Sequence, residues 1–379
     1  MRRRIGVVVA TLVLAAGLGV PAAGAQAHML VGIQDDALTL YGNPTFTFPL
    51  LRTLRVQIIR INLIWGGTPY GVANNRRPAH PQDPADPAYD WTLYDRAVRY
   101  AAQSHIQVLF SILFTPKWAN GGAARNVPPR RYADLQNFAY AAAERYSGHY
   151  IPTEDNPDQL PLPAVKKWLA WNEPNNPVWL KQASGGHFTS PRSYAQICTA
   201  VWRGVHYTNF AGERVACGAT GPRGNNAARS SRPSMSPLAF MRAARKAGMR
   251  HLDAYAHHPY YGRPSESPGN RPSGGAVELG NLRTLIAQSN RLFGRKPIWI
   301  TEYGYQTRPP DRIFGVSYGQ QARYLTEAYA IARHTPQVQM MIWFMLRDDT
   351  NLNIGWQSGL LTASGKKKPA FNAFRRLPH

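Results

Sequence analysis

The 379-residue sequence has few cysteines, few acidic residues and only one long apolar run. Two cysteines, Cys198 and Cys217, exclude a fold held together by several disulfides and allow at most one within the chain. We expect them in a helix and in the strand that follows it, so a disulfide and two buried free thiols both remain open. There is no zinc-finger spacing and no basic amphipathic helix, and we therefore expect no nucleic-acid partner.

Acidic side chains are scarce: 21 Asp and Glu face 44 Lys and Arg, for a formal net charge of +23. Without residues 1–27, the chain keeps 41 basic and 21 acidic residues and a net charge of +20. Such a charge attracts polyanions, among them acidic glycans and cell-wall polymers. The large excess of Arg over Lys has a second explanation, codon usage in a GC-rich genome.

The single long apolar run, residues 5–20, follows three arginines and precedes a small-residue stretch that ends at residue 27. This is the layout of a secretory signal peptide. A membrane anchor is the alternative, but the run is short for a span and ends in an Ala-x-Ala-like site. We expect residues 1–27 to be removed, the mature chain 28–379 to be secreted, and no stable membrane span after cleavage.

The rest of the chain alternates short apolar runs, often β-branched, with helical patterns. We expect eight strands, at residues 29–33, 56–63, 108–113, 165–171, 215–219, 252–257, 298–301 and 338–344. Helical patterns cover residues 93–103, 134–146, 193–210, 237–247, 277–292 and 318–333, with short ones near 49–53 and 369–375. No Ser/Thr/Pro-rich linker and no internal repeat divides the chain. Eight β-α units predict an α/β fold, a single-domain (β/α)8 TIM barrel.

Two glutamates lie at the ends of predicted strands. Glu173 follows the fourth strand and precedes Pro174, which cannot continue a ladder. Glu302 ends the seventh strand, where strand alternation places Ile298, Ile300 and Glu302 on the side that faces the barrel axis. Because such barrels do their chemistry at the carboxyl ends of the strands, the pair predicts hydrolysis of a sugar bond.

Further polar residues lie near the same predicted edge. Arg60 is inside the second strand, where its guanidinium can hold a carboxylate ionised; a purely structural salt bridge is the alternative. Asn172 precedes Glu173 and can donate a hydrogen bond to a sugar hydroxyl. His257 and His258 end the sixth strand and raise the alternative of a metal site. No His-x-His motif and no other convincing strand-end histidine completes such a ligand set, so we expect no metal.

Tryptophans recur at this edge as well. Trp343 closes the eighth strand, and Trp118 and Trp179 lie in the loops after the third and fourth strands. The apolar faces of sugar rings stack on aromatic side chains, so these residues favour a carbohydrate ligand.

Together these residues resemble the motifs of a large clan of retaining glycoside hydrolases built on (β/α)8 barrels. Asn172-Glu173-Pro174 is similar to the clan's acid/base motif, and Thr301-Glu302-Tyr303-Gly304 is similar to its nucleophile motif. His258-Pro259-Tyr260 resembles the His-x-Tyr after strand six. Arg60 resembles the arginine of strand two, and Trp343 resembles the sugar-platform tryptophan of strand eight. Residues 89–91 and 115–119 further resemble glycoside hydrolase family 39 and related bacterial exopolysaccharide hydrolases. The cellulase-like enzymes of family 5 are the nearest rival.

The resemblance implies double displacement, with Glu302 as the nucleophile and Glu173 as the acid and then the base. It also implies that Arg60 and Tyr260 keep Glu302 charged, that Asn172 binds the sugar 2-hydroxyl, that His258 supports the carboxylates and that Trp343 stacks under the sugar. We expect no metal and no organic cofactor. A non-catalytic carbohydrate-binding barrel and a transglycosylase with the same carboxylate pair are the alternatives.

Two predicted strand-following loops are rich in basic residues and poor in acids. The first carries Lys117, Arg125, Arg130 and Arg131, and the second carries Arg223, Arg229 and Arg232. These charges suggest that the carbohydrate partner is acidic or lies in an anionic cell wall.

Overall fold

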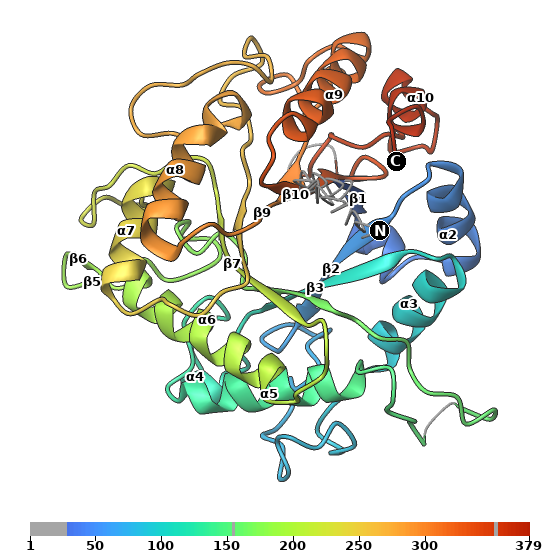
Figure 1. Ribbon diagram of the computed structural model, residues 1–379, viewed down its shortest axis with the longest axis vertical. Helices are drawn as coiled ribbons and strands as arrows, with labels where there is room; N and C mark the ends of the chain where they lie inside the picture. Colours follow the sequence, from blue (N-terminus) through green and yellow to red (C-terminus); the bar gives the residue numbers. More distant parts are fainter. Residues whose placement is uncertain (1–28, 154–155, 352–354) are drawn as a thin grey trace, which may run out of the picture.

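The computed structural model describes residues 29–153, 156–351 and 355–379, and in it eight parallel strands close into a barrel with helices around it (Figure 1). The predicted signal peptide lies outside the described residues. The barrel strands are β1 (Leu30–Gln34), β2 (Ile58–Ile64), β3 (Gln107–Leu113), β4 (Lys167–Ala170), β7 (Arg214–Thr220), β8 (Ala254–His257), β9 (Ile298–Tyr303) and β10 (Val338–Phe344). The barrel closes where β1 pairs with both β2 and β10. The prediction of a (β/α)8 barrel is confirmed, with all eight strands at the expected places.

The helices form the outer ring. They are α1 (Asp36–Thr39), α2 (Pro44–Thr53), α3 (Thr92–Gln103), α4 (Lys117–Asn120), α5 (Tyr132–Arg145), α6 (Ser190–His206), α7 (Pro237–Lys246), α8 (Leu282–Phe293), α9 (Tyr318–Arg333) and α10 (Pro369–Arg375). A proline stands in the first turn of α2, α6, α7 and α10. The N–H groups of a first turn have no acceptor within the helix, so the missing N–H of proline costs no hydrogen bond there. A 3₁₀ turn (Leu279–Asn281) precedes α8, and a small hairpin of β5 (Ala183–Ser184) and β6 (His187–Phe188) precedes α6. The sequence did not predict α1, α4 or this hairpin.

The interior of the barrel is filled by side chains and separates the two ends. Its apolar layer consists of Ile58, Leu109, Leu169, Ala216, Ala219, Ala254, Ala256, Trp299, Met340 and Ile342. The alternate strand residues pack outward against the helices in a second, larger core. The space above the inner layer, at the carboxyl ends of the strands, is therefore the place where polar side chains of different strands can meet.

Strand β9 does not follow simple alternation. Trp299 lies in the inner layer, whereas Ile298 and Ile300 belong to the outer core. The predicted inward orientation of the two isoleucines is therefore wrong. From Ile300 to Tyr303, β9 advances three residues while its partner β10 advances two. This bulge shifts the alternation by one position, so that Glu302 still turns to the centre of the barrel.

Cys198 of α6 and Cys217 of β7 form a disulfide, with Cα atoms 5.9 Å apart, so the alternative of two free thiols is wrong. Both residues are fully buried, and the bond ties a helix of the outer ring to the strand that follows it. Within the described ranges, none of the helices has the length and apolar character needed to cross a membrane.

Candidate active site

Arg60 is the hub of the polar cluster at the carboxyl end of the barrel. It is completely buried and points inward from β2, as its alternation with Ile58 predicts. One guanidinium nitrogen, Nη1, donates to Glu302 Oε1 at 2.6 Å, and the other, Nη2, donates to Asn172 Oδ1 at 2.6 Å. Nη2 also lies 3.3 Å from Ser111 Oγ. Arg60 therefore joins residues of β2, β9 and the end of β4, and its contact with Asn172 leaves the amide NH2 group as the part that can donate to a ligand.

Glu302 is held by donors on both of its oxygens. Oε1 accepts from Arg60, and Oε2 accepts from the hydroxyl of Tyr260 at 3.2 Å. Burial and the charges of Glu302 and Glu173 raise the pKa of Tyr260 well above its ordinary value, so the phenol stays protonated and donates. The Glu302 side chain is only 11% exposed, and its position is fixed by these two partners.

Glu173 lies beyond the end of β4, in a segment of unusual backbone conformation. Trp171 and Glu173 both have positive φ angles, 70° and 33°, which are uncommon for residues other than glycine. The backbone N–H of Glu173 donates to the carbonyl of Ala219, and its Oε2 accepts from Asn176 at 2.8 Å. Burial raises the pKa of Glu173, against smaller lowering effects of Asn176, the Arg60 charge and Trp179. A raised pKa is what a general acid needs near neutral pH.

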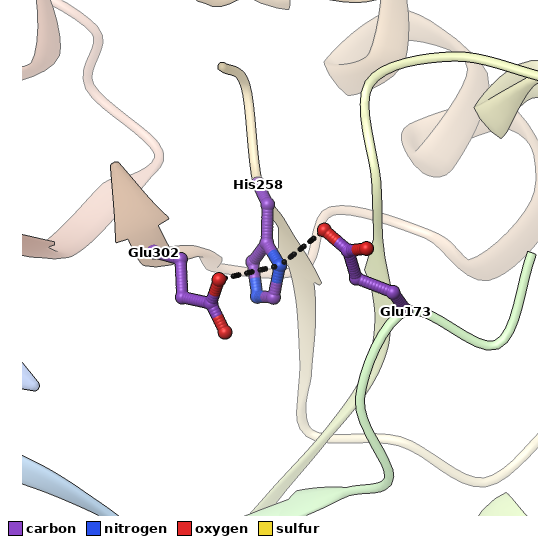
Figure 2. A group of neighbouring side chains, drawn as sticks. All are labelled: Glu173, His258 and Glu302. Atoms are coloured by element: carbon purple, nitrogen blue, oxygen red, sulfur yellow. Dashed lines mark hydrogen bonds and ion pairs between the residues drawn. The ribbon is translucent and has the colours of Figure 1, made fainter. Parts of the chain in front are cut away.

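His258 stands between the two glutamates, as Figure 2 shows. Its Nδ1 lies 3.2 Å from Glu173 Oε1 and 3.6 Å from Glu302 Oε2, and its Nε2 lies 2.9 Å from Thr301 Oγ1. Burial lowers the pKa of His258 to about 4, with the charge of Glu302 opposing the effect and that of Arg60 adding to it. The imidazole is therefore neutral at neutral pH. The network then assigns the proton to Nδ1, which donates to the carboxylates, while Nε2 accepts from Thr301.

Glu173, His258 and Glu302 each offer one atom, and these atoms all lie within 4.8 Å of one another. Two carboxylates and an imidazole at this spacing are also a donor set for a cation. Here hydrogen bonds account for the set, because Arg60 already supplies positive charge to Glu302 and the Nδ1 proton faces both carboxylates. His257, the other candidate ligand, instead faces Thr220 Oγ1 and the Val277 carbonyl, at 2.9 and 3.0 Å.

The three predicted tryptophans have different surroundings. Trp179 is half-buried, stacks on Phe114 with a centroid separation of 5.6 Å, and contributes a hydrogen bond to Glu173. Trp118 is also half-buried, but its indole donates to the Ala73 carbonyl at 2.7 Å and so holds the loop after β2. Trp343 is completely buried and donates to the Ser358 carbonyl at 2.9 Å. A side chain with no exposed surface offers no platform to a sugar, so the prediction for Trp343 is wrong.

Trp356 lies at the site, although the sequence did not single it out. It is 41% exposed, and its ring lies 5.5 Å from that of Tyr260, the residue that donates to Glu302. Its position in the loop after the eighth strand was the available signal, since all such loops lie at the carboxyl face.

A cleft of about 460 Å³ opens beside Glu173, between the segments that follow β4 and β7. Asn176, Arg223 and Arg232 are among its lining residues. Arg223 forms an ion pair with Glu278, whereas Arg232 has an exposed side chain. Part of the second basic loop thus faces the space next to Glu173.

Comparisons with known proteins agree with this geometry. The family model described as "Glycosyl hydrolase catalytic core" matches residues 153–374, a segment that contains both glutamates and His258 but not Arg60. No curated protein sequence matches the chain.

Many solved structures share the fold at low sequence identity. A family 39 glycoside hydrolase from Bacteroides cellulosilyticus WH2 superposes with a TM-score of 0.60 at 20% identity over 91% of this chain, which spans 62% of that protein. A glucosidase from Croceicoccus marinus gives a TM-score of 0.65 at 16% identity, over 92% of this chain and 67% of the other. Fungal β-1,4-galactanases give 0.59 at 13% identity, over 92% and 99%.

Proposed function

The chain belongs to the glycosyl hydrolase catalytic core family and is a glycosidase, and from this premise we propose that it cleaves O-glycosidic bonds with retention of configuration. The observation that carries the proposal is the spacing of the two glutamates. In retaining enzymes the carboxyl groups are about 5–5.5 Å apart, and in inverting enzymes about 6.5–9.5 Å. The facing oxygens of Glu173 and Glu302 lie within 4.8 Å, which leaves no room for the water that an inverting mechanism places between base and sugar.

The environments of the two glutamates support different roles for them. Glu302 is oriented by Arg60 at 2.6 Å and by the Tyr260 hydroxyl at 3.2 Å, and a carboxylate fixed in this way suits the role of nucleophile. It attacks the anomeric carbon and forms a covalent glycosyl-enzyme. Glu173, whose pKa is raised by burial, gives its proton to the departing oxygen. Glu173 then takes a proton from water, which attacks the anomeric carbon and restores Glu302 as a carboxylate.

Asn172 and His258 serve this sequence of steps without exchanging protons with the substrate. The amide of Asn172 is oriented by Arg60, so its NH2 group can donate to the sugar 2-hydroxyl beside the reacting carbon. The neutral His258 keeps its Nδ1 proton between the two carboxylates as the charge moves from Glu302 to Glu173. It thereby fixes the spacing of the pair through both displacements.

We also propose that the enzyme is secreted and acts on an oligo- or polysaccharide. The disulfide between Cys198 and Cys217 supports export, because such bonds persist in oxidising compartments. The signal-peptide pattern of residues 1–27 points the same way. The exposed Arg232, which lines the cleft beside Glu173, favours a polymer with acidic groups or one embedded in an anionic cell wall.

The test uses the oxidised chain 28–379 and a panel of aryl glycosides and polysaccharides, with the configuration of the first product followed by NMR. We expect the anomer first released to be that of the substrate. Glu302→Ala should abolish turnover, whereas Glu173→Ala should spare substrates with activated leaving groups and regain rate with azide. Glu144→Gln, on the outer helix α5, is the matched control. First release of the opposite anomer, or wild-type turnover by Glu302→Ala, would contradict the mechanism.

A further inference from the structure

A third carboxylate, that of Asp36, reaches the carboxyl end of the barrel and has no part in the mechanism above. It follows β1, and in the closed strand order β1 lies directly across the barrel from β7. The basic cleft beside Glu173 is bounded by the loop after β7. The two sides of the site therefore differ in charge, with a carboxyl group on one side and arginines on the other.

Asp36 is connected to the catalytic cluster by hydrogen bonds. Its Oδ1 accepts from the backbone N–H of Asn62 at 3.3 Å, and the side chain of Asn62 lies 3.4 Å from Nη2 of Arg60. Arg60 in turn contacts Glu302. Burial raises the pKa of Asp36 to about 7, against lowering effects of Asn62 and Arg60. Near neutral pH such a carboxyl group can both accept and donate hydrogen bonds, as a sugar hydroxyl requires.

Two tyrosine rings lie beside Asp36 and are open to solvent. Tyr41 and Tyr70 are 37% and 54% exposed, and their ring centroids are 4.7 Å apart. The backbone N–H of Tyr41 donates to the carbonyl of Asp36 at 3.0 Å. The Tyr94 hydroxyl lies 3.4 Å from the carbonyls of both Asn62 and Tyr70 and so holds the second ring next to the same strand end. Exposed aromatic rings next to a polar hydrogen-bonding group are the composition of a sugar site.

We propose that Asp36, Tyr41 and Tyr70 bind the sugar unit that is transferred to Glu302, and that this unit is a neutral sugar without a carboxylate or sulfate group. The inference rests on the proposed function. A carboxylate on that unit would lie between Asp36 and Glu302. Arg60 is already engaged by Glu302 and Asn172. Any acidic groups of the substrate would then lie on the leaving-group side, next to the exposed Arg232.

Another cation, Arg347, follows β10 near the same side. Its charge acts on Asp35, the residue that caps α1 and accepts from the backbone N–H groups of Leu346 and Arg347. Among the charges that act on Asp36, that of Arg60 lowers its pKa and that of Asp35 raises it.

The first test compares aryl glycosides of neutral pentoses and hexoses, in both anomers, with glucuronides and galacturonides. We expect turnover of a neutral glycoside and little of the uronides. Asp36→Asn should lower kcat/KM on the neutral substrate about 10- to 100-fold. A deoxy analogue that lacks the hydroxyl bound by Asp36 should be insensitive to this substitution. Tyr70→Ala should raise KM with little change in kcat, and the exposed Asp158→Asn and Tyr207→Ala are matched controls.

A binding experiment separates this inference from the proposed function. Calorimetric titration of neutral and acidic oligosaccharides into Glu302→Gln does not depend on turnover. We expect neutral ligands to bind, and Asp36→Asn in the Glu302→Gln background to weaken them by the same factor. Preferred binding or turnover of uronides, or Asp36→Asn and Tyr70→Ala variants within twofold of their parent, would overturn the inference. Absence of hydrolysis together with Asp36-dependent binding of neutral sugars would overturn only the proposed function.

Discussion

Replacing Arg60 with methionine tests whether the buried guanidinium holds the active site together. Methionine is unbranched like the aliphatic part of arginine, but it lacks the guanidinium group and its charge. Arg60 is completely buried and the Glu302 side chain is 11% exposed, so the substitution leaves a carboxylate with little access to water. Removing one member of a buried ion pair costs about 3–5 kcal/mol, and the stranded oxygen of Asn172 adds to the loss. We expect the free energy of unfolding at pH 7 to fall by that amount.

A double-mutant cycle with Glu302→Gln isolates the pair. The amide of glutamine is neutral and does not need a counter-charge, so Arg60→Met should cost much less in the Glu302→Gln background. We expect a coupling energy of about 2–4 kcal/mol. The assay is urea denaturation with the disulfide intact, in which a shift of midpoint at constant slope reports stability. Unfolding gives a readout even for variants that are inactive.

The control for this cycle is Arg77→Met. Arg77 pairs with Asp134 at 2.8 Å, but its side chain is 45% exposed, so its removal should cost at most about 1 kcal/mol. A coupling energy below about 0.5 kcal/mol between Arg60 and Glu302 would refute the reasoning, because distant, independent sites add to within that margin. It would mean that water, or another group, compensates the charge of Glu302.

Three further predictions concern pH and the disulfide. Burial raises the pKa of Glu173 above its ordinary value of 4.5, and the acid form is lost as pH rises through this raised pKa; kcat/KM on substrates with poor leaving groups should therefore fall on the alkaline side, whereas substrates with activated leaving groups should lack this limb. Burial also raises the pKa of Glu213 from 4.5 to about 7, so its neutral form favours the fold, and stability should decline as pH rises from 4.5 to about 7. Glu213→Gln should increase the free energy of unfolding at pH 8 by about 2 kcal/mol, and an unchanged pH profile of stability would contradict this. Joint replacement of Cys198 and Cys217 by alanine opens a loop of 19 residues and should cost about 3 kcal/mol; a loss under about 0.5 kcal/mol in urea denaturation would count against the linkage.

The barrel could be predicted from the sequence because the same signal is repeated eight times. Each strand is a short, nearly continuous apolar run, and most are followed by an amphipathic helix, so single errors at the boundaries do not change the count. The contacts of Arg60, Asn172, His258 and Tyr260 followed from the same fact. Once their strands are placed in a parallel barrel, their strand-end positions bring them to one face.

The remainder depended on details that alternation does not contain. Because of the bulge in β9, Ile298 and Ile300 point outward although Glu302 points inward, and no residue type in that strand indicates a bulge. Trp343 and Trp356 are two further differences from the predicted site. Met340 and Ile342 fill the inner layer of the barrel, so Trp343 between them and Phe344 turns outward into the larger core, whereas Trp356 lies after β10, with its ring beside Tyr260.

Asp36 was missed for a different reason. In the sequence it is one of two adjacent aspartates that read as a turn or a helix start, and Asp35 does cap α1. The proximity of Asp36 to Arg60 arises only when β1 and β2 lie side by side, with Gln34 opposite Arg60. The position of Asp36 therefore depends on the pairing of two strands, which the local sequence pattern around Asp36 does not show.

The bulge in β9 also limits how this active site can be transferred. A Thr-Glu-Tyr-Gly segment copied into a regular strand of another barrel would place its glutamate one step out of phase, among the surrounding helices. Deletion of Thr301 would close the bulge and move the glutamate one residue along β9, out of its present place beside Arg60, even though all charged side chains stay in the protein. The donor segment and its irregular pairing with β10 must be moved together. A sequence alignment that matches the motif but omits the extra residue of the bulge would therefore identify the nucleophilic glutamate without giving the orientation of its side chain.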